Sequence, residues 1–324
     1  MDKETRSASI VKLIIWTLVA IILTGVLAVW SISALNGGAP YGTFSLFGGY
    51  VYDDPETYSV GDMEYGEIID SIDISWINGS VNVVVWNEKY VKINETGALQ
   101  GDGDKVRTKV MDGKLTVKFM ESGLRIFQGT PQKSLTVYIP AKMAENMELL
   151  EADLASADIS VDGFYQADKY VSDVNAFNFE EIDVDSVSGN VNIDCNSVKS
   201  ANITNGSGSV KLNGKIESLV LEEISGRVEI NGNIGEAEIN TVSGAVIFTA
   251  VNHLPDALRI ESVSGNIKLD LPHIESGFFA HLDSISGRII WNGGSGREYS
   301  YGSAKVGYYF DTVSGNVEIT VKKH

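Results

Sequence analysis

The sequence has few of the residues that usually build catalytic or metal sites. Its 324 residues include one cysteine, Cys195, and four histidines. A single cysteine excludes an intrachain disulfide and a zinc site of the usual cysteine-rich kind, and we interpret Cys195 as a small buried hydrophobe. The histidines show no metal-ligand spacing, and neither a nucleophile elbow nor a phosphate-binding glycine loop occurs. We therefore predict no catalytic residue and no cofactor.

Basic residues are also scarce. Lysine and arginine number 25 against 43 aspartates and glutamates, which gives a formal net charge of −18. Such a chain would repel the phosphates of DNA or RNA. We expect no nucleic-acid partner.

One long stretch has no charge at all. Residues 13–35 are uncharged, and they are long enough to cross a hydrocarbon core of about 30 Å. A cleaved signal peptide is the alternative, although its apolar region would be shorter than this one. No cysteine directly follows the apolar run, so the sequence predicts no lipid anchor.

The charges around this stretch predict its orientation. Lys3, Arg6 and Lys12 precede it, and the next basic residue is Lys89. Positive charge on the short side predicts a cytoplasmic tail at residues 1–12, a transmembrane helix at residues 13–35 and an extracellular bulk of the chain. We therefore expect a single-pass protein of the cell membrane.

The rest of the chain repeats one short pattern. A glycine preceded by a small polar and a β-branched residue recurs at steps of 18 to 28 residues. A period of this size is typical of a solenoid, in which each repeat forms one coil. The clear copies are Gly189, Gly208, Gly226, Gly244, Gly265, Gly287 and Gly315, with a more distant copy at Gly79 and a weaker one at Ala157.

Apolar residues keep fixed positions around the glycine. They stand five and two residues before it, and two and four residues after it. This alternation indicates half-buried strands, with a corner at which glycine permits positive φ or close backbone approach. Stacked coils would form an all-β, parallel β-helix or β-roll, and right-handed crossovers are favoured. A β-sandwich is the alternative, but it gives no reason for one corner to keep its flanking columns.

The segments before the repeats have a different character. Residues 36–66 are rich in glycine and tyrosine and are interpreted as a juxtamembrane linker. Residues 67–149 are interpreted as a first coil with capping β-hairpins, and residues 150–324 as the solenoid repeats. Two turn signals lie in the capping part, at residues 101–104 and 111–113. The first resembles part of a calcium loop, but a plain turn is favoured because later ligands are missing.

Two departures from regular spacing occur later in the chain. Residues 162–181 are either a degenerate coil or a loop, and an insertion at residues 292–309 lengthens the last step. Tyr299 and Tyr301 lie in this glycine- and serine-rich insertion. They are candidate contacts for a cell-surface protein or glycan, with a plain surface loop as the alternative. The chain finishes at residues 322–324, which predicts a short, lysine-blunted final edge.

One outward column is acidic. Four residues before the corners stand Asp185, Glu222, Glu261, Asp283 and Asp311. Stacking would bring such carboxylates close together along one face, which suggests either a cation-binding ladder or a solvated acidic face. Like charges repel, and Arg259 and His281 in the neighbouring column dilute the ladder. We favour the solvated face and predict no metal.

The repeated VSGxV and ISGxI corners resemble a bacterial family of unknown function whose members are called putative adhesins. The resemblance covers about residues 68–321. Its carriers are VSGNV (187–191), ISGRV (224–228), VSGAV (242–246), VSGNI (263–267), ISGRI (285–289) and VSGNV (313–317).

The resemblance implies a solenoid at the cell envelope, since several members are membrane-anchored surface proteins of Gram-positive bacteria. It supplies no catalytic residue. We therefore predict a non-enzymatic adhesion, binding or scaffold module. One alternative is a carbohydrate-active enzyme of the β-helix kind, a lyase or hydrolase. The other is an envelope-stress sensor or accessory protein.

The orientation can be tested directly. Because the basic residues precede the apolar run, a reporter fused after His324 should be active only outside the cytoplasm. Protease added to intact protoplasts should digest the repeats. Repeats that are protected from the protease would contradict the predicted orientation.

Overall fold

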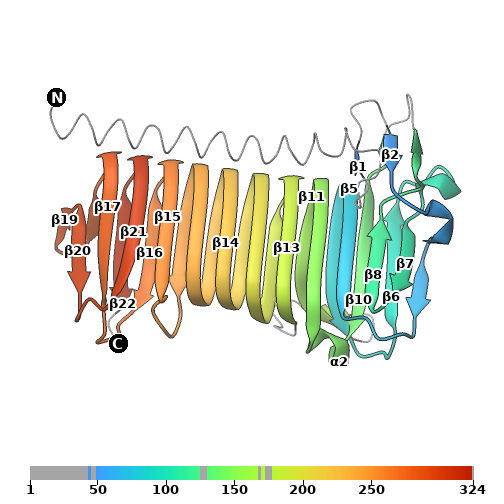
Figure 1. The fold of residues 1–324 in the computed structure, drawn as a ribbon, viewed down its shortest axis with the longest axis horizontal. Coiled ribbons are helices and arrows are strands. Elements are labelled where there is room, and N and C mark those ends of the chain that lie inside the picture. The colour runs from blue at the N-terminus through green and yellow to red at the C-terminus, as the bar shows by residue number, and fades with distance from the viewer. Residues whose placement is uncertain (1–42, 45–48, 125–129, 167–168, 172–176, 323–324) are drawn as a thin grey trace. The chain divides into compact units, whose positions relative to one another are not determined.

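The computed structural model describes residues 43–44, 49–124, 130–166, 169–171 and 177–322 (Figure 1). Its described chain is all-β apart from one short helix, α2 (Ala141–Ala144), and two single 3-10 turns. The chain divides into two compact units between Ser197 and Val198, and each is described by itself. The division lies within the repeats, whereas the sequence suggested a boundary at residue 149.

The predicted membrane span, residues 13–35, lies outside the described residues. Within the described part, the structure contains no helix that is both long and apolar enough to span a bilayer.

The N-terminal unit holds most of the irregular structure. Its 3-10 turns are η1 (Pro55–Thr57) and η2 (Asp102–Asp104). Its strands are β1 (Thr43–Phe44), β2 (Gly49–Val51), β3 (Ser59–Val60), β4 (Met63–Tyr65), β5 (Ser71–Trp86), β6 (Val91–Gly97), β7 (Arg107–Met111), β8 (Lys114–Lys118), β9 (Gly123–Leu124), β10 (Lys133–Pro140), β11 (Met147–Gln166), β12 (Lys169–Val171), β13 (Asn178–Ser188) and the first residues of β14 (Val191–Ala250).

Strands β5 and β11 each form a whole coil of this unit. They pair in parallel from one side of the corner to the other, with Gly79 of β5 opposite Ala157 of β11. On its other side β5 pairs in parallel with β8 before the corner and with β10 after it. Strand β11 pairs onward with β13 and the start of β14. The coil at Gly79 is therefore an internal one. Strand β11 pairs directly with β13, so no further coil stands between them; within residues 162–181, residues 167–168 and 172–176 lie outside the described residues.

Antiparallel strands cover the outer coil formed by β8 and β10. Strand β7 pairs with β8, and β6 pairs with β10. The turn between β7 and β8 uses Asp112 and Gly113 with φ of 51° and 83°, as a hairpin turn of the predicted type requires. The other predicted turn, at residues 101–104, forms η2 and links β6 to β7.

A buried ion pair joins the covering strand β6 to strand β10 of the outer coil. Lys133 Nζ lies 2.6 Å from Glu95 Oε1, and both side chains are buried. The same ammonium lies 3.9 Å from the ring centre of Phe119 and 4.9 Å from that of Trp76. A carboxylate and two aromatic faces thus replace the water that the ammonium loses on folding. This pair was not predicted from the sequence.

Part of the predicted linker belongs to the folded unit. Strands β3 and β4 pair with β7 and β6. Tyr50 and Tyr52 are buried, and the Tyr50 hydroxyl accepts a hydrogen bond from the backbone N–H of Phe119 at 3.0 Å. The linker interpretation of residues 36–66 is therefore wrong from residue 49 onward, because its tyrosines fill the outer coil.

The C-terminal unit is a more regular stack. It contains the rest of β14, which runs through three coils with corners at Gly208, Gly226 and Gly244. Its remaining strands are β15 (Ala257–Ser264), β16 (Ile267–Pro272), β17 (Phe278–Ser286), β18 (Ile289–Trp291), β19 (Gly294–Gly296), β20 (Glu298–Tyr301), β21 (Val306–Ser314) and β22 (Val317–Lys322). The pairing between coils is parallel, as a solenoid requires and a sandwich of antiparallel strands does not. The hand of the coil stays a prediction.

The last two coils of this unit stack in reverse chain order. Strand β21 pairs in parallel with both β15 and β17, and β22 pairs with both β16 and β18. Figure 1 shows β21 between β17 and β15. The insertion forms β19 and β20, which pair antiparallel with β18 and β17. The predicted lysine-blunted final edge is therefore wrong, because β22 is internal and the insertion covers the terminal coil.

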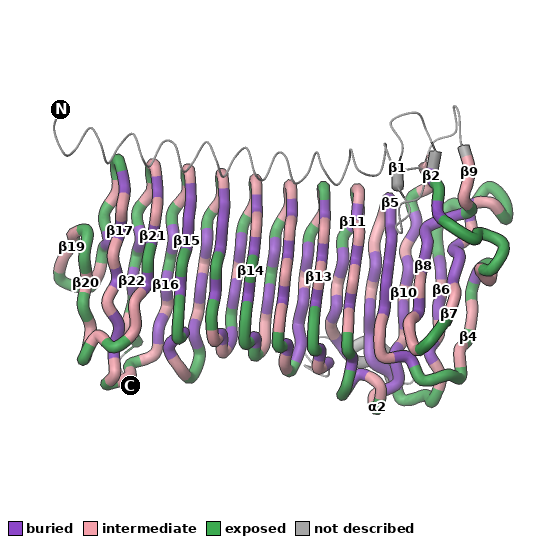
Figure 2. The backbone as a smooth tube through the Cα atoms, in the orientation of Figure 1, coloured by how far each residue is buried: buried purple, intermediate pink, exposed green. Residues whose placement is uncertain are grey.

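The columns of the repeat confirm most of the predicted core. Residues five before the corner, and two and four after it, are buried in nearly every coil (Figure 2). The β-branched residues two before the corner are not: Val187 is 40% exposed and Ile285 41%. Because side chains alternate between the two faces of a strand, the residue three before the corner points inward like the residue five before it. That buried position is polar, for example Asn205 and Glu223.

Close backbone approach explains the glycine at the corner. A Cβ on Gly226 would lie 1.6 Å from the carbonyl oxygen of Gly208, and one on Gly244 would lie 1.9 Å from that of Gly226. These distances are far below van der Waals contact. Adjacent coils can therefore pair only because glycine has no Cβ at the corner.

Replacement of a corner glycine should therefore be costly even without positive φ. We expect Gly226→Ala to lower the free energy of unfolding of the full-length chain in detergent by about 1–3 kcal/mol. Gly66→Ala is the control, since nothing lies within 4 Å of a Cβ there. Equal denaturant midpoints for the two variants would show that the corner tolerates a side chain.

Candidate functional site

Four carboxylates form a two-by-two array on the outer face of the N-terminal unit. Glu151 and Asp153 of β11 stand opposite Asp183 and Asp185 of β13 in the parallel register. Adjacent strands lie only about 4.8 Å apart. We call these four residues the acidic grid.

Lysines from β8 neutralise one side of this region. Lys114 Nζ lies 3.0 Å from Glu151 Oε2 and 3.2 Å from Asp73 Oδ2. Lys118 is buried, lies 3.4 Å from Asp73 Oδ1 and donates a hydrogen bond of 2.9 Å to Ser75 Oγ. Neither lysine could be predicted from the sequence, because only the parallel pairing of β8 with β5 brings them to this face.

The carboxylates of the grid that no lysine pairs with directly still repel their acidic neighbours. Burial, together with the charges of Asp185, Asp73 and Glu151, raises the pKa of Asp153 to about 7 against the opposing effect of Lys118. Burial also raises the pKa of Asp183 to about 6, and the charged neighbours that act on it are all acidic. Near neutral pH the grid therefore holds protons that isolated carboxylates would release.

The predicted acidic ladder is divided between the two units. Asp185 belongs to the grid, whereas Glu261, Asp311 and Asp283 stand side by side on β15, β21 and β17. Glu222 is half-exposed, and the stacking of the corners places it between threonine and asparagine rather than beside another carboxylate.

Arg259 interrupts this ladder. Its Nε lies 2.6 Å from Glu261 Oε1, and its terminal nitrogen lies 2.7 Å from Asp311 Oδ2. Among the described residues no group of three or more His, Cys, Asp or Glu side chains could hold a metal ion. At Glu261 and Asp311 the predicted ladder is therefore part of an ion-paired outer face. We do not assign Glu222 as a metal ligand.

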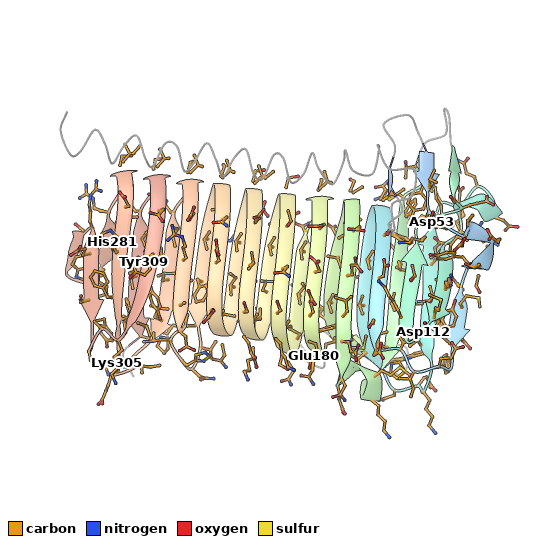
Figure 3. All side chains as sticks on the ribbon, in the orientation of Figure 1. Asp53, Asp112, Glu180, His281, Lys305 and Tyr309 are labelled. Carbon is orange, nitrogen blue, oxygen red and sulfur yellow. The ribbon has the colours of Figure 1, made fainter. Side chains whose placement is uncertain are left out.

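Aromatic side chains lie next to the ladder on the same outer face. The register places Tyr309 of β21 between Arg259 of β15 and His281 of β17, and Figure 3 labels Tyr309 and His281 there. Tyr309 is 49% exposed, and the ring of Phe279 stacks on that of His281 at 6.4 Å between centres. We call Arg259, Phe279, His281, Tyr309 and Asp311 the Tyr309 patch.

The patch could not be assembled from the sequence. Arg259, His281 and Tyr309 occupy the same column six residues before successive corners, which is a usable signal. In chain order, however, Tyr309 comes last, and only the reversed stacking of the final coils places its ring between the other two.

The two tyrosines predicted from the sequence have a packing role. Tyr299 stacks on Trp291 with ring centres 4.8 Å apart, and Tyr301 packs against Phe278 and His273. Both are half-buried on β20, where they cover the apolar interior of the terminal coil. A ligand contact by Tyr299 or Tyr301 stays a prediction. The alternative of a plain surface loop is wrong, because the insertion forms β19 and β20.

These features define a class. The chain is a β-solenoid repeat protein whose outward columns carry ordered charged and aromatic side chains. It belongs to the Toastrack DUF4097 family, which matches residues 69–320. This match confirms the resemblance seen in the VSGxV and ISGxI corners.

Several solved structures are similar over most of the chain. A putative adhesin from Bacteroides fragilis is 13% identical, covers 81% of this chain and 97% of its own, and has a TM-score of 0.43. A putative lipid binding protein from Parabacteroides distasonis is 12% identical, with coverages of 82% and 97% and a TM-score of 0.40. A putative cell adhesion protein from Clostridium sporogenes is 10% identical, with coverages of 82% and 100% and a TM-score of 0.27. No curated protein sequence matches the chain.

The acidic grid makes stability depend on pH. The folded-state pKa of Asp153 is about 7 against an ordinary value of 3.8, so the folded state keeps a proton that the unfolded state releases between these values. Stability is therefore greatest on the acid side, falls as pH rises through this window and is level above it.

Asp153→Asn removes one titrating group from the grid. We expect this variant to match the wild type only below the ordinary pKa of 3.8 and to exceed its thermal midpoint at pH 8. Asp53→Asn, in an exposed segment of the same unit, is the control. A lower midpoint for Asp153→Asn at pH 8 would contradict the repulsion in the grid.

Proposed function

We propose that this chain is a membrane-anchored, non-enzymatic binding module displayed at the bacterial cell envelope. Residues 13–35 are the anchor, residues 1–12 are cytoplasmic, and the coils lie outside the membrane. The charges around the apolar run support this orientation, and membership of the Toastrack DUF4097 family supports a surface solenoid.

The Tyr309 patch carries the proposal of binding. Its tyrosine offers a large exposed ring with a polar tip, which suits recognition at low entropic cost. The ring lies over Gly307, where a Cβ would be only 3.0 Å from a ring carbon. The glycine therefore leaves room for the ring, and the strand beneath it limits its freedom.

The chemistry around the ring favours a glycan as the partner. Asp311 and Asp283 stand opposite one another beside the ring, and Arg259, which is paired with Asp311, has further guanidinium N–H donors. Sugar C–H faces can pack on the ring, while sugar hydroxyls donate to carboxylates and accept from the guanidinium. Arg and Tyr are also the residues that most often dominate binding energy in interfaces.

The scaffold is suited to such a role. In a solenoid each coil contacts only its neighbours, and the stack presents an extended, regular surface. Because Arg259, Tyr309 and His281 are on three paired strands, their spacing is fixed by the sheet rather than by a loop. A rigid site loses little freedom when its ligand binds.

A glycan array tests the proposal. The full-length chain in nanodiscs should bind a subset of cell-surface glycans, and Tyr309→Ala should weaken that binding about tenfold or more, as loss of a central aromatic contact does. Its thermal midpoint should stay close to that of the wild type, because the ring is half exposed.

Tyr90→Ala provides the matched control, since it removes a tyrosine of the N-terminal unit. This variant should bind as the wild type does. Equal binding by Tyr309→Ala and the wild type, or no glycan bound by the wild type, would refute a glycan site at the patch.

A further inference from the structure

One inner column of the C-terminal unit is polar throughout. Three residues before each corner, where alternation points the side chain inward, the coils carry no aliphatic residue. All these side chains are buried, at no more than 4% exposure: Asn205, Glu223, Thr241, Ser262, Ser284 and Thr312.

Glu223 and its neighbour Asn205 form the critical pair of this column. Both residues are fully buried, and Asn205 Nδ2 donates to Glu223 Oε2 at 2.9 Å. The other oxygen of each side chain, Glu223 Oε1 and Asn205 Oδ1, is buried without a hydrogen-bond partner among the described residues. If the carboxyl group is ionised, both of these atoms are acceptors and neither can satisfy the other.

No positive charge offsets Glu223 inside the unit. Among its described residues, every lysine and arginine side chain is exposed to solvent. The charged side chains on the same and adjacent coils occupy half-exposed or exposed positions, and Arg227 is already paired with Glu229. They are Lys199, Lys211, Lys215, Glu217, Glu222, Arg227, Glu229, Glu236 and Glu238.

An ionised, fully buried carboxylate without a cation is very costly. A carboxylic acid costs much less, and its O–H supplies the one donor that this pair lacks. A single proton would therefore satisfy both unpartnered oxygens and close a ring of two hydrogen bonds between the side chains.

We propose that Glu223 is a buried proton-binding site in the folded protein. The neutral carboxyl group donates from Oε1 to Asn205 Oδ1, and Asn205 Nδ2 donates back to Oε2. Loss of the proton leaves two facing acceptors and an unpaired charge inside the coil, which weakens the stack at the Gly226 corner.

Burial supports the assignment by raising the pKa of Glu223 to about 7, against the opposing effects of Asn205 and the backbone N–H of Ser225. The ordinary value is 4.5, so the folded state holds a proton that the unfolded state has released between these values. The stabilising effect is complete below the lower value and falls through this window. It is level above the higher value.

Difference infrared spectroscopy of the full-length chain in detergent tests the site directly. The wild type should show the carbonyl band of a protonated carboxylic acid at pH 6, lost with a midpoint near pH 7. Glu223→Gln keeps the shape and both hydrogen bonds, and it should lack this component of the band. Glu222→Gln changes the adjacent, half-exposed glutamate and should retain it. The same band in the wild type and in Glu223→Gln would overturn the proposal.

Hydrogen exchange measures the consequence for the stack. After correction for intrinsic exchange, the opening constant of the wild-type coil at residues 217–230 should rise by about tenfold per pH unit between pH 5 and 7. Glu222→Gln should keep this slope, and Glu223→Gln should lose it. If Glu223→Gln does not fold, Glu223→Thr, which copies Thr241 of the next coil, serves the same purpose. An unchanged slope in the folded variant would refute the proton site.

Discussion

The close contact between backbones at the glycine corners is the constraint on which the other features depend. The carbonyl oxygen of Gly208 occupies the space that a Cβ of Gly226 would need, and Gly226 stands in the same relation to Gly244. Because the coils meet backbone to backbone there, their flanking strands pair in parallel and in register. Side chains at equal distances from the corner are consequently aligned in columns, and the inward columns are buried in nearly every coil.

Aligned columns concentrate whatever chemistry the repeats share. Carboxylates in one outward column repel each other, as Asp153 and Asp185 do, unless a basic residue such as Arg259 lies between them. In an inward column each polar group is unfavourable unless the protein supplies a hydrogen-bond partner, because water cannot reach it. At Glu223 the least costly solution is a proton, whereas Lys133 and Glu95 in the N-terminal unit satisfy the same requirement with an ion pair.

Both units interrupt their regular stack in a similar way. In each unit one coil is completed out of chain order, and antiparallel strands pair with its open edge. In the N-terminal unit β6 pairs with β10 and β7 with β8, and in the C-terminal unit β20 pairs with β17 and β19 with β18. Covering strands satisfy edge hydrogen-bonding groups that would otherwise recruit another chain. The same reversal in the C-terminal unit assembles the Tyr309 patch, so protection of the edge and formation of the proposed site have one structural cause.

The sequence by itself determined the all-β class, the family, the corners and the hairpin at Asp112 and Gly113, because these depend on local backbone preference and on a repeat that is visible within a few residues. It did not determine the stacking order of the coils, the burial of Tyr50, or the grouping of Arg259, Tyr309 and His281. Those depend on which strand completes a coil after an insertion, and an insertion of given length allows more than one return path. The inner column at Glu223 was predictable from the sequence only in part. Strict alternation predicts it. The β-branched residues two before the corner, however, look like a core column in the sequence, and only their exposure in the structure shows that their side chains point outward.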